Sequence, residues 1–325
     1  MKILAFGEVM MRLTPPLYAM LEQSTQLDVA FVGTGVNLLG GLARFGHEVA
    51  LVSKVPDNAI GKAAKARLRQ LGINDQWVEF AGDHMGSFLV ELGYGNRPSV
   101  VTYQNRLASS FCVSGKEAYD LEAMLAGVTV VHICGITLSL TPAVREMALT
   151  LAKQAKSQGV TVCFDFNYRP SLNVNNDPGV LRQTYETILE LADVVFGNMR
   201  DIIELLGVKV QELAGAGKWL HEHYGVSYFA GTQRKPKELK GFVVKGGVLY
   251  ESSPVTVEIL DRIGSGDAFA LGVLHGYLKG WEMKKLLDFA VANAQLAHTT
   301  LGDVPMLTEG QVLGYLANPQ VDLLR

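Results

Sequence analysis

Short, mostly apolar runs recur along the chain and are separated by longer segments that mix apolar and polar residues. The runs, which we expect to be strands, cover residues 3–6, 49–53, 128–133, 160–166, 194–196 and 226–231. Several intervening segments have helical periodicity, and they cover residues 37–45, 60–71, 142–157 and 201–206. Apolar strands that alternate with helices are typical of a parallel sheet covered on both faces, because each parallel crossover needs an intervening element. The pattern therefore predicts an α/β core.

One region breaks this alternation. Residues 77–101 are predicted to form two or three strands, with turns at 82–83 and 93–98 and no helix between them. Together with the irregular stretch 13–33, they indicate a small β flap beside the main sheet. A flap of this kind can act as a lid over a site, and a structural extension of the sheet or a dimer surface is the alternative.

The sequence also bears on domain organisation. It contains no internal repeat, low-complexity tract or linker. We therefore expect a single domain over residues 1–325, with a lid formed by about residues 12–33 and 77–110.

Composition narrows the class of function. With 48% hydrophobic and 19% charged residues, the 325-residue chain can build a large core and has no signature of disorder. A net charge of −3 gives no basic field, which argues against nucleic acid or anionic lipid as a partner. No apolar run approaches the roughly 20 residues needed to span a bilayer, and the early glutamate in MKILAFGEVMMRL does not suit a secretory signal. We expect a cytoplasmic protein with no membrane partner.

Cysteine and histidine usage gives no metal or disulfide signature. Cys112, Cys134 and Cys163 are odd in number, far apart and in apolar settings, which predicts reduced core thiols. The His-Glu-His sequence at 221–223 does not make HExxH, and we interpret it as a solvated helix end.

The stretch Leu260–Gly272, LDRIGSGDAFALG, carries the strongest local signal of chemistry. A strand-like segment at 255–260 leads into a turn of small residues at 264–266, and 268–278 has the character of a buried helix. Small residues let consecutive backbone N–H groups point toward one spot, and the helix N-terminus adds partial positive charge there. The turn is therefore interpreted as an anion hole suited to phosphate.

Asp267 directly after this turn has two interpretations. It could accept a proton from a hydroxyl that attacks a phosphoryl group, or it could merely cap the helix. Competing phosphate motifs are absent from the sequence, since it contains neither GxxxxGK[ST] nor a GxGxxG after the first strand.

Two blocks together carry a family resemblance. DRIGSGDAFALG, paired with GTGVNLLGGLARFG at 33–46, resembles the two signatures of the ribokinase-like, or PfkB, sugar kinases. The resemblance covers almost the whole chain and implies a three-layer α/β/α sandwich with a mostly parallel central sheet and a small β-sheet lid. Within that group, the stretches 7–16, 103–110 and 165–172 resemble 2-keto-3-deoxygluconate kinases. A sugar acid calls for cationic groups, which the arginines of the last two stretches can supply.

The resemblance implies a role for each matching residue. Asp267 would be the catalytic base, with the anion hole made by Gly264, Ser265 and Gly266. Sugar contacts would come from Gly33, Thr34, Asn37, Tyr94, Tyr103, Arg106, Asp165, Arg169 and Asp267, with Asn167 on the same strand end as Asp165. ATP contacts would come from Asn198, Thr232, Arg234, Gly264, Gly266 and Asn293.

Three positions depart from the family pattern. Val32 stands where a second glycine is usual, and Asp201 replaces the glutamate of an NxxE motif that helps to organise magnesium. Arg262 and Ile263 precede Gly264 where many relatives have two threonines, so local nucleotide contacts could differ.

The predicted activity is ATP-dependent phosphorylation of the primary hydroxyl of 2-keto-3-deoxygluconate to its 6-phosphate. ATP and Mg²⁺ held mainly through phosphates are the implied cofactors, with a monovalent cation as a further possible one, and a homodimer or larger homo-oligomer is expected. The alternatives are a PfkB kinase of fructose, ribose or 2-keto-3-deoxygalactonate, and a non-catalytic sugar or nucleotide sensor on the same fold.

Overall fold

The central sheet runs through the molecule and is mostly parallel. The structure is a computed structural model that describes residues 1–115 and 119–319. Its central strands are β1 (Lys2–Phe6), β4 (Glu48–Val55), β5 (Val78–Phe80), β8 (Val128–Cys134), β9 (Thr161–Asp165), β10 (Val194–Phe196), β11 (Tyr228–Lys235), β12 (Glu238–Lys245), β13 (Val248–Glu251) and β14 (Val255–Thr256). They are ordered β13-β12-β11-β10-β9-β8-β1-β4-β5, with β14 paired to β12. The pairs from β5 to β11 are parallel, and those made by β12 are antiparallel.

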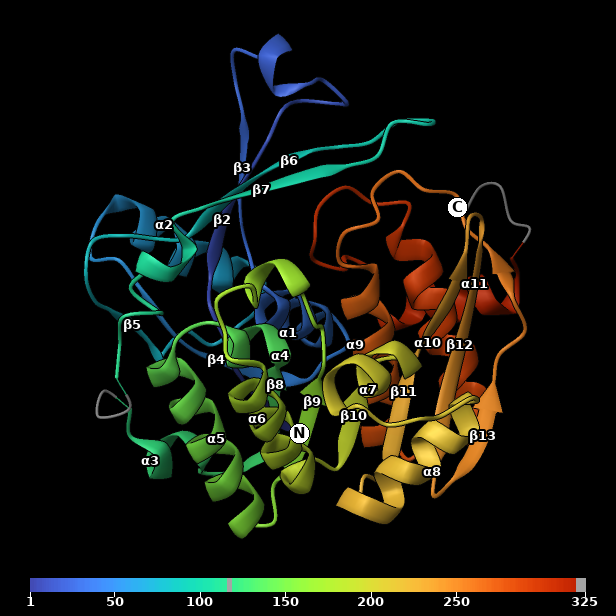
Figure 1. Cartoon of the computed structure of the whole chain (residues 1–325). Coiled ribbons are helices and arrows are strands. Elements are labelled where there is room, and N and C mark those ends of the chain that lie inside the picture. Colours follow the sequence, from blue (N-terminus) through green and yellow to red (C-terminus); the bar gives the residue numbers. More distant parts are fainter. Residues whose placement is uncertain (116–118, 320–325) are drawn as a thin grey trace.

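Helices cover both faces of this sheet (Figure 1). They are α1 (Thr34–Arg44), α2 (Ala59–Gln70), α3 (Leu121–Leu125), α4 (Gly135–Ser139), α5 (Pro142–Ser157), α6 (Pro178–Leu191), α7 (Met199–Leu206), α8 (Leu213–Tyr224), α9 (Ser265–Leu278), α10 (Met283–Ala297) and α11 (Glu309–Ala317). Alternate strand residues point to opposite faces. Ile3 and Ala5 pack with α1, α2, α9, α10 and α11, whereas Leu4 and Phe6 pack with α3 to α8. The predicted three-layer α/β/α arrangement is confirmed.

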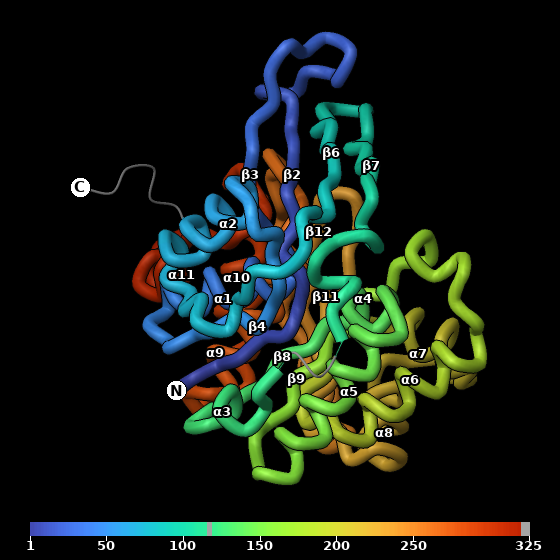
Figure 2. The backbone as a smooth tube through the Cα atoms, turned by 90° about the vertical axis from the view of Figure 1, so that its left-hand side faces the viewer, coloured from blue at the N-terminus to red at the C-terminus, as the bar shows by residue number. Residues whose placement is uncertain are grey.

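A second, smaller sheet projects from the body of the molecule, as Figures 1 and 2 show. We call it the small sheet, and it consists of β2 (Met10–Thr14), β3 (Asp28–Val32), β6 (Ser87–Glu91) and β7 (Val100–Gln104), in the order β3-β2-β6-β7. Its strands enclose an apolar cluster of Met10, Val32, Phe88, Val90 and Leu92, which we call the small-sheet cluster. A separate small sheet that projects from the body agrees with the predicted flap.

Two strand predictions need correction. Residues 78–80, placed with the flap, form β5 and pair with β4 at the edge of the central sheet. The segment 255–260 is extended only at β14, which pairs two residues with β12 before the chain turns toward α9. Apolar alternation was correct about extended backbone at 78–80 but could not identify its hydrogen-bonding partner, and at 255–260 it overestimated the length of the strand.

Two helices begin three residues earlier than predicted. The periodicity placed the starts at residues 37 and 268, whereas α1 begins at Thr34 and α9 at Ser265. The first turns carry small or polar residues, because they face a cavity instead of the core. By contrast α5 matches its prediction, since Thr141 caps it and Pro142 occupies its first turn.

Side chains that could have signalled other chemistry have structural roles. The three cysteines are free and buried, as predicted. His221 and His223 lie on the exposed end of α8 and bond to backbone carbonyls, which agrees with a solvated helix end. Across residues 1–115 and 119–319, no helix is long and apolar enough to cross a membrane.

Candidate active site

A cavity of about 550 Å³ opens at the carboxyl ends of the parallel strands. Open α/β sheets bind ligands at this edge, because the loops after the strands converge there. One wall comes from the small sheet through Met10, Val32, Phe88, Val101 and Tyr103. The floor is formed by the starts of α1 and α9, which carry the two blocks singled out in the sequence.

Asp267 lies in the first turn of α9 and faces α1. The amide Nδ2 of Asn37 donates to Asp267 Oδ2 at 2.7 Å. The two helices can approach closely because Gly41 has no side chain, and a Cβ there would lie 2.3 Å from Leu271. Glycine at 41 therefore helps to bring the two blocks together, although 230 residues separate Asn37 from Asp267.

The structure argues against the capping interpretation of Asp267. The N-cap of α9 is Gly264, and no side chain caps this helix. Burial raises the pKa of Asp267 to about 8, and repulsion from Asp165 adds to the shift, while the hydrogen bond from Asn37 opposes it. A carboxyl with this pKa inside a cavity suits proton transfer near neutral pH.

The turn before Asp267 has the geometry of an anion site. Gly264 has φ of +80°, and a Cβ added there would lie 1.9 Å from the carbonyl oxygen of Asp303. The N–H groups of Gly266 and Asp267 follow in the first helical turn, where no intrahelical carbonyl is available to them. They are free to bind a phosphate oxygen, assisted by the helix dipole.

Most of the predicted sugar residues line this cavity. They are Gly33, Thr34, Asn37, Tyr103, Arg106, Asp165, Arg169 and Asp267, and Asn167 at the strand end of Asp165 lines the cavity too. Tyr94 does not, since it lies in the connection between β6 and β7, where the residue is 70% exposed and its ring centroid lies 4.9 Å from that of Tyr18. Its position near the tip of a projecting hairpin separates it from the cavity, and no local sequence pattern reports that.

Arg106 is paired with a residue that sequence reasoning missed. Its Nε donates to the Glu8 carboxylate at 3.0 and 3.1 Å, and its Nη2 bonds the same group. Both side chains are buried, and Arg106 Nη1 has no hydrogen-bond partner among the described residues. One N–H direction therefore remains for a ligand. The position of Glu8 just after the first predicted strand is the signal that could have identified it.

Arg169 differs from Arg106 in its electrostatic surroundings. It is exposed at the cavity, donates to the carbonyl of Tyr168 at 3.3 Å, and forms no ion pair in the part of the chain that the structure describes. Its charge lowers the pKa of Asp165, although burial and repulsion from Asp201 are larger and raise that pKa to about 7. Arg169 is thus a cation available to an anionic ligand.

The predicted nucleotide residues divide in the same way. Those on the cavity are Asn198, Thr232, Arg234, Gly264 and Gly266, whereas Asn293 is fully buried. It lies on α10 behind α9, and its Nδ2 donates to the carbonyl of Ala268 at 2.7 Å. Asn293 thus contributes to packing between α9 and α10 and does not line the cavity.

Arg234 joins the turn from the neighbouring strand β11. It donates through Nη2 to Ser265 Oγ at 2.8 Å, and Ser265 in turn donates to the carbonyl of Arg262 at 2.7 Å. Repulsion from Arg262 contributes, after burial, to lowering the Arg234 pKa. The guanidinium groups thus place positive charge beside the anion site.

The departures from the family pattern have local explanations. Val32 belongs to the small-sheet cluster, while Gly33 must be glycine because a Cβ would lie 2.4 Å from the Glu8 carbonyl oxygen. Asp201 accepts the N–H of Asn198 at 2.8 Å and completes a capping box for α7, so the shorter side chain still reaches its helix start. Ile263 packs against the small-sheet cluster, and Arg262 is exposed at the cavity.

Comparison with known proteins agrees with this geometry. The model of the pfkB family carbohydrate kinases matches residues 1–309. The chain belongs to the PfkB family of carbohydrate kinases. It is therefore a kinase with the ribokinase-like fold, as the two blocks predicted.

Several relatives of this PfkB kinase have a named activity or a solved structure. A protein of Enterococcus faecalis, provisionally assigned as a 2-keto-3-deoxygluconate kinase, is 49% identical, with a TM-score of 0.96 over 100% of this chain and 99% of its own. The 2-dehydro-3-deoxygluconokinase of Thermotoga maritima is 29% identical, with a TM-score of 0.91 over 98% and 100%. The 2-dehydro-3-deoxygalactonokinase of Haloferax volcanii is 29% identical over 96% of this chain and 95% of its own.

Proposed function

We propose that this PfkB kinase transfers the γ-phosphoryl group of ATP to the primary hydroxyl of 2-keto-3-deoxygluconate, giving the 6-phosphate and ADP. The observation that supports the proposal is that Asp267 lies beside a turn with N–H groups free to bind an anion, while Arg169, which forms no ion pair among the described residues, lines the same cavity. A phosphate and a sugar carboxylate are both anions, so the cavity needs positive charge at two places. Relatives named for 2-keto-3-deoxy sugar acids support this substrate class.

The geometry suggests a direct transfer. The sugar oxygen forms a bond to the γ-phosphorus as the bond from that phosphorus to the ADP oxygen breaks, and Asp267 accepts the hydroxyl proton. The N–H groups at the start of α9 stabilise the charge that develops on the transferring group. The small sheet, which forms one wall, would act as a lid that keeps water from the phosphoryl group.

Magnesium fits as an ion carried by the nucleotide. Within residues 1–115 and 119–319, no group of three or more His, Cys, Asp or Glu side chains could hold a metal. Mg²⁺ usually keeps several waters and is bound by phosphates with one or two carboxylates. Asp165 and Asp201 both line the cavity and would serve as those carboxylates. The ion would neutralise charge on the phosphates.

A pH dependence follows from the surroundings of Asp267. Since only the ionised carboxylate can accept a proton, we expect kcat/KM to rise about tenfold per pH unit below the pKa of about 8 and to level off above it. Steady-state kinetics in overlapping buffers would measure this rise in kcat/KM. Asn37→Ala removes the donor that stabilises the carboxylate, so the rise should move to higher pH. A profile that stays flat through neutral pH would contradict the role of Asp267.

Substrate choice is expected to depend on Arg169. The wild type should prefer 2-keto-3-deoxygluconate or its galactonate epimer over fructose and ribose, in a coupled assay of ADP release. Arg169→Gln should lower kcat/KM for the sugar acid about 30-fold, the effect of one charged hydrogen bond, and should change turnover of any neutral sugar less.

Arg182→Gln is the matched control, because Arg182 lies on α6 in an exposed pair with Glu186. It should leave the ranking of sugars unchanged. Preference of the wild type for a neutral sugar would overturn the assignment, and tight ligand binding without any transfer would favour a sensor.

Assembly and location remain predictions. Exposed apolar side chains, Val29 and Val100 on the small sheet and Leu17 in the connection between β2 and β3, support a homodimer or larger homo-oligomer, because exposed apolar surface favours contact with another surface. A cytoplasmic location is likewise expected from the sequence alone.

A further inference from the structure

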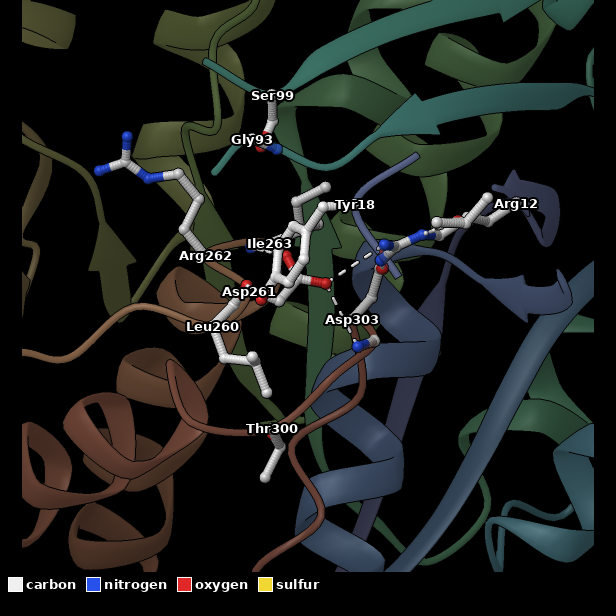
Figure 3. Close-up of polar contacts among 12 residues, drawn as sticks. Arg12, Tyr18, Gly93, Ser99, Leu260, Asp261, Arg262, Ile263, Thr300 and Asp303 are labelled. Carbon is white, nitrogen blue, oxygen red and sulfur yellow. Dashed lines mark hydrogen bonds and ion pairs between the residues drawn. The ribbon is translucent and has the colours of Figure 1, made fainter. Parts of the chain in front are cut away.

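Two buried carboxylates lie behind the anion-binding turn. Asp261 is 2% exposed and Asp303 is 6% exposed. The first immediately precedes the turn, and the backbone of the second touches Gly264. Figure 3 shows both acidic groups directed toward the same point on the small sheet. Two neighbouring carboxylates out of contact with water need a counter-ion.

Arg12 of strand β2 supplies that counter-ion. Its Nη2 lies 3.2 Å from Asp261 Oδ2, and its Nη1 bonds Asp303 Oδ1. Its Nε donates to Thr14 Oγ1 at 2.9 Å, and the whole side chain is 4% exposed. Among the residues that the structure describes, no other basic side chain forms an ion pair with either aspartate.

Asp261 and Asp303, which we call the acidic pair, connect Arg12 to the backbone of the turn. Asp261 Oδ1 accepts the N–H of Ile263 at 3.0 Å, and Oδ2 accepts the N–H of Gly302 at 3.3 Å. The residue before Gly264 and the segment 302–303 that contacts Gly264 are therefore both connected to the Arg12 guanidinium. Burial raises the pKa of Asp303, and Arg12 opposes that shift, so loss of Arg12 would favour protonation or displacement of the carboxylate.

Two further contacts join the small sheet and its β2–β3 connection to the same segment. Ile263 packs against the small-sheet cluster, and Tyr18 Oη donates to the carbonyl of Leu260 at 3.2 Å. By contrast, the side chain of Arg262 points away from Arg12 and the acidic pair, as Figure 3 shows. The small sheet is thus linked to the turn through a buried ionic contact, an apolar contact and a hydrogen bond.

We propose that Arg12 is a positioning residue for phosphoryl transfer: its guanidinium is a built-in cation that holds the acidic pair, and with it the anion-binding turn, in place. The chain then needs no bound monovalent cation at this point. The inference rests on the proposed phosphoryl transfer but not on which sugar accepts the group.

The test is Arg12→Ala in the full chain, assayed with ATP and whichever sugar the wild type phosphorylates. We expect kcat to fall about 30-fold, because the anion site loses its alignment, while KM for the sugar changes less than about threefold. Guanidinium chloride or potassium chloride at about 50 mM should restore part of kcat in this variant by entering the vacated space, and should not activate the wild type. Sodium chloride and choline chloride at equal ionic strength separate cation size from general salt effects.

Two further variants complete the test. Arg12→Lys keeps the charge but loses the fork to two carboxylates, so it should fall between the wild type and Arg12→Ala and respond less to added cation. Arg97→Ala removes an arginine in the connection between β6 and β7, which bonds the carbonyl of Tyr18. It should retain kcat within about twofold and show no cation response.

The outcomes distinguish this inference from failure of the proposed function. Absence of transfer to any sugar by the wild type would end the proposed function. Activation of an active wild type by a monovalent cation, a full kcat in Arg12→Ala, or a loss accompanied by a lower Tm and no rescue would overturn the role of Arg12. If Arg12→Ala does not fold, the intermediate kcat and cation response of Arg12→Lys decide the question.

Discussion

Asp267→Asn is expected to lower kcat about 1000-fold, within the range for loss of a general base. The substitution removes the proton acceptor and little else, because an asparagine oxygen can still accept the hydrogen bond that Asn37 donates at 2.7 Å. Binding of the sugar should therefore change less than about threefold. Steady-state kinetics and calorimetric titration of the sugar would measure the two quantities separately.

The matched control for Asp267→Asn is Asp288→Asn. Asp288 lies on α10, pairs with Lys284 one turn away and takes no part in the cavity. It should retain wild-type kcat and a Tm within a few degrees, because exposed pairs of this type contribute about 0.3–0.5 kcal/mol. If Asp267→Asn kept more than about a tenth of wild-type kcat, Asp267 could not be the principal base.

Gly264→Ala is expected to lower kcat about 100-fold or more, the scale of losing an oxyanion donor, and to lower Tm as well. Two physical costs coincide at this position. The backbone has φ of +80°, which disfavours any residue with a Cβ, and that Cβ would lie 1.9 Å from the carbonyl oxygen of Asp303. The turn must shift, and the N–H groups of Gly266 and Asp267 would then no longer converge.

Gly280→Ala separates backbone strain from damage to the anion site. Gly280 also has positive φ, +64°, but a Cβ there meets nothing within 4 Å, and the residue lies outside the cavity. It should lower Tm by a few degrees, as expected for about 1 kcal/mol of strain, and leave kcat unchanged. Equal kcat losses in both variants would show that the position of Gly264 in the turn is not important for transfer.

Much of the fold was readable from local pattern. Helix α5 and strand β10 have the predicted bounds, since a capped apolar stripe and a short buried run are both local features. The bounds were less accurate where a helix start serves a site, as at Thr34 and Ser265. Hydrophobic periodicity reports the side of a helix that faces the core and carries no information about the turn that faces a ligand.

Candidate site residues were predictable where the backbone conformation requires glycine. Gly33 and Gly264 cannot carry side chains because backbone carbonyls occupy that space, and both appeared in the sequence as small-residue clusters. Tyr94 and Asn293 do not line the cavity, since Tyr94 is exposed in the connection between β6 and β7 and Asn293 is buried on α10 behind α9. Adjacency along the chain does not determine the direction of a side chain across a hairpin tip or between two helices.

The sequence by itself determined the layered α/β fold, and it predicted a turn of small residues at a helix start with a carboxylate directly after it, because strand periodicity, glycine freedom and helix dipoles are local properties. Only the tertiary structure decided which charges remain available. Arg106 is neutralised by Glu8, and Arg12 by a pair of aspartates 249 and 291 residues away, whereas Arg169 has no acidic partner among the described residues. A buried charge depends on whatever the fold brings within a few ångströms of it, and that distance is set by packing and not by separation along the chain.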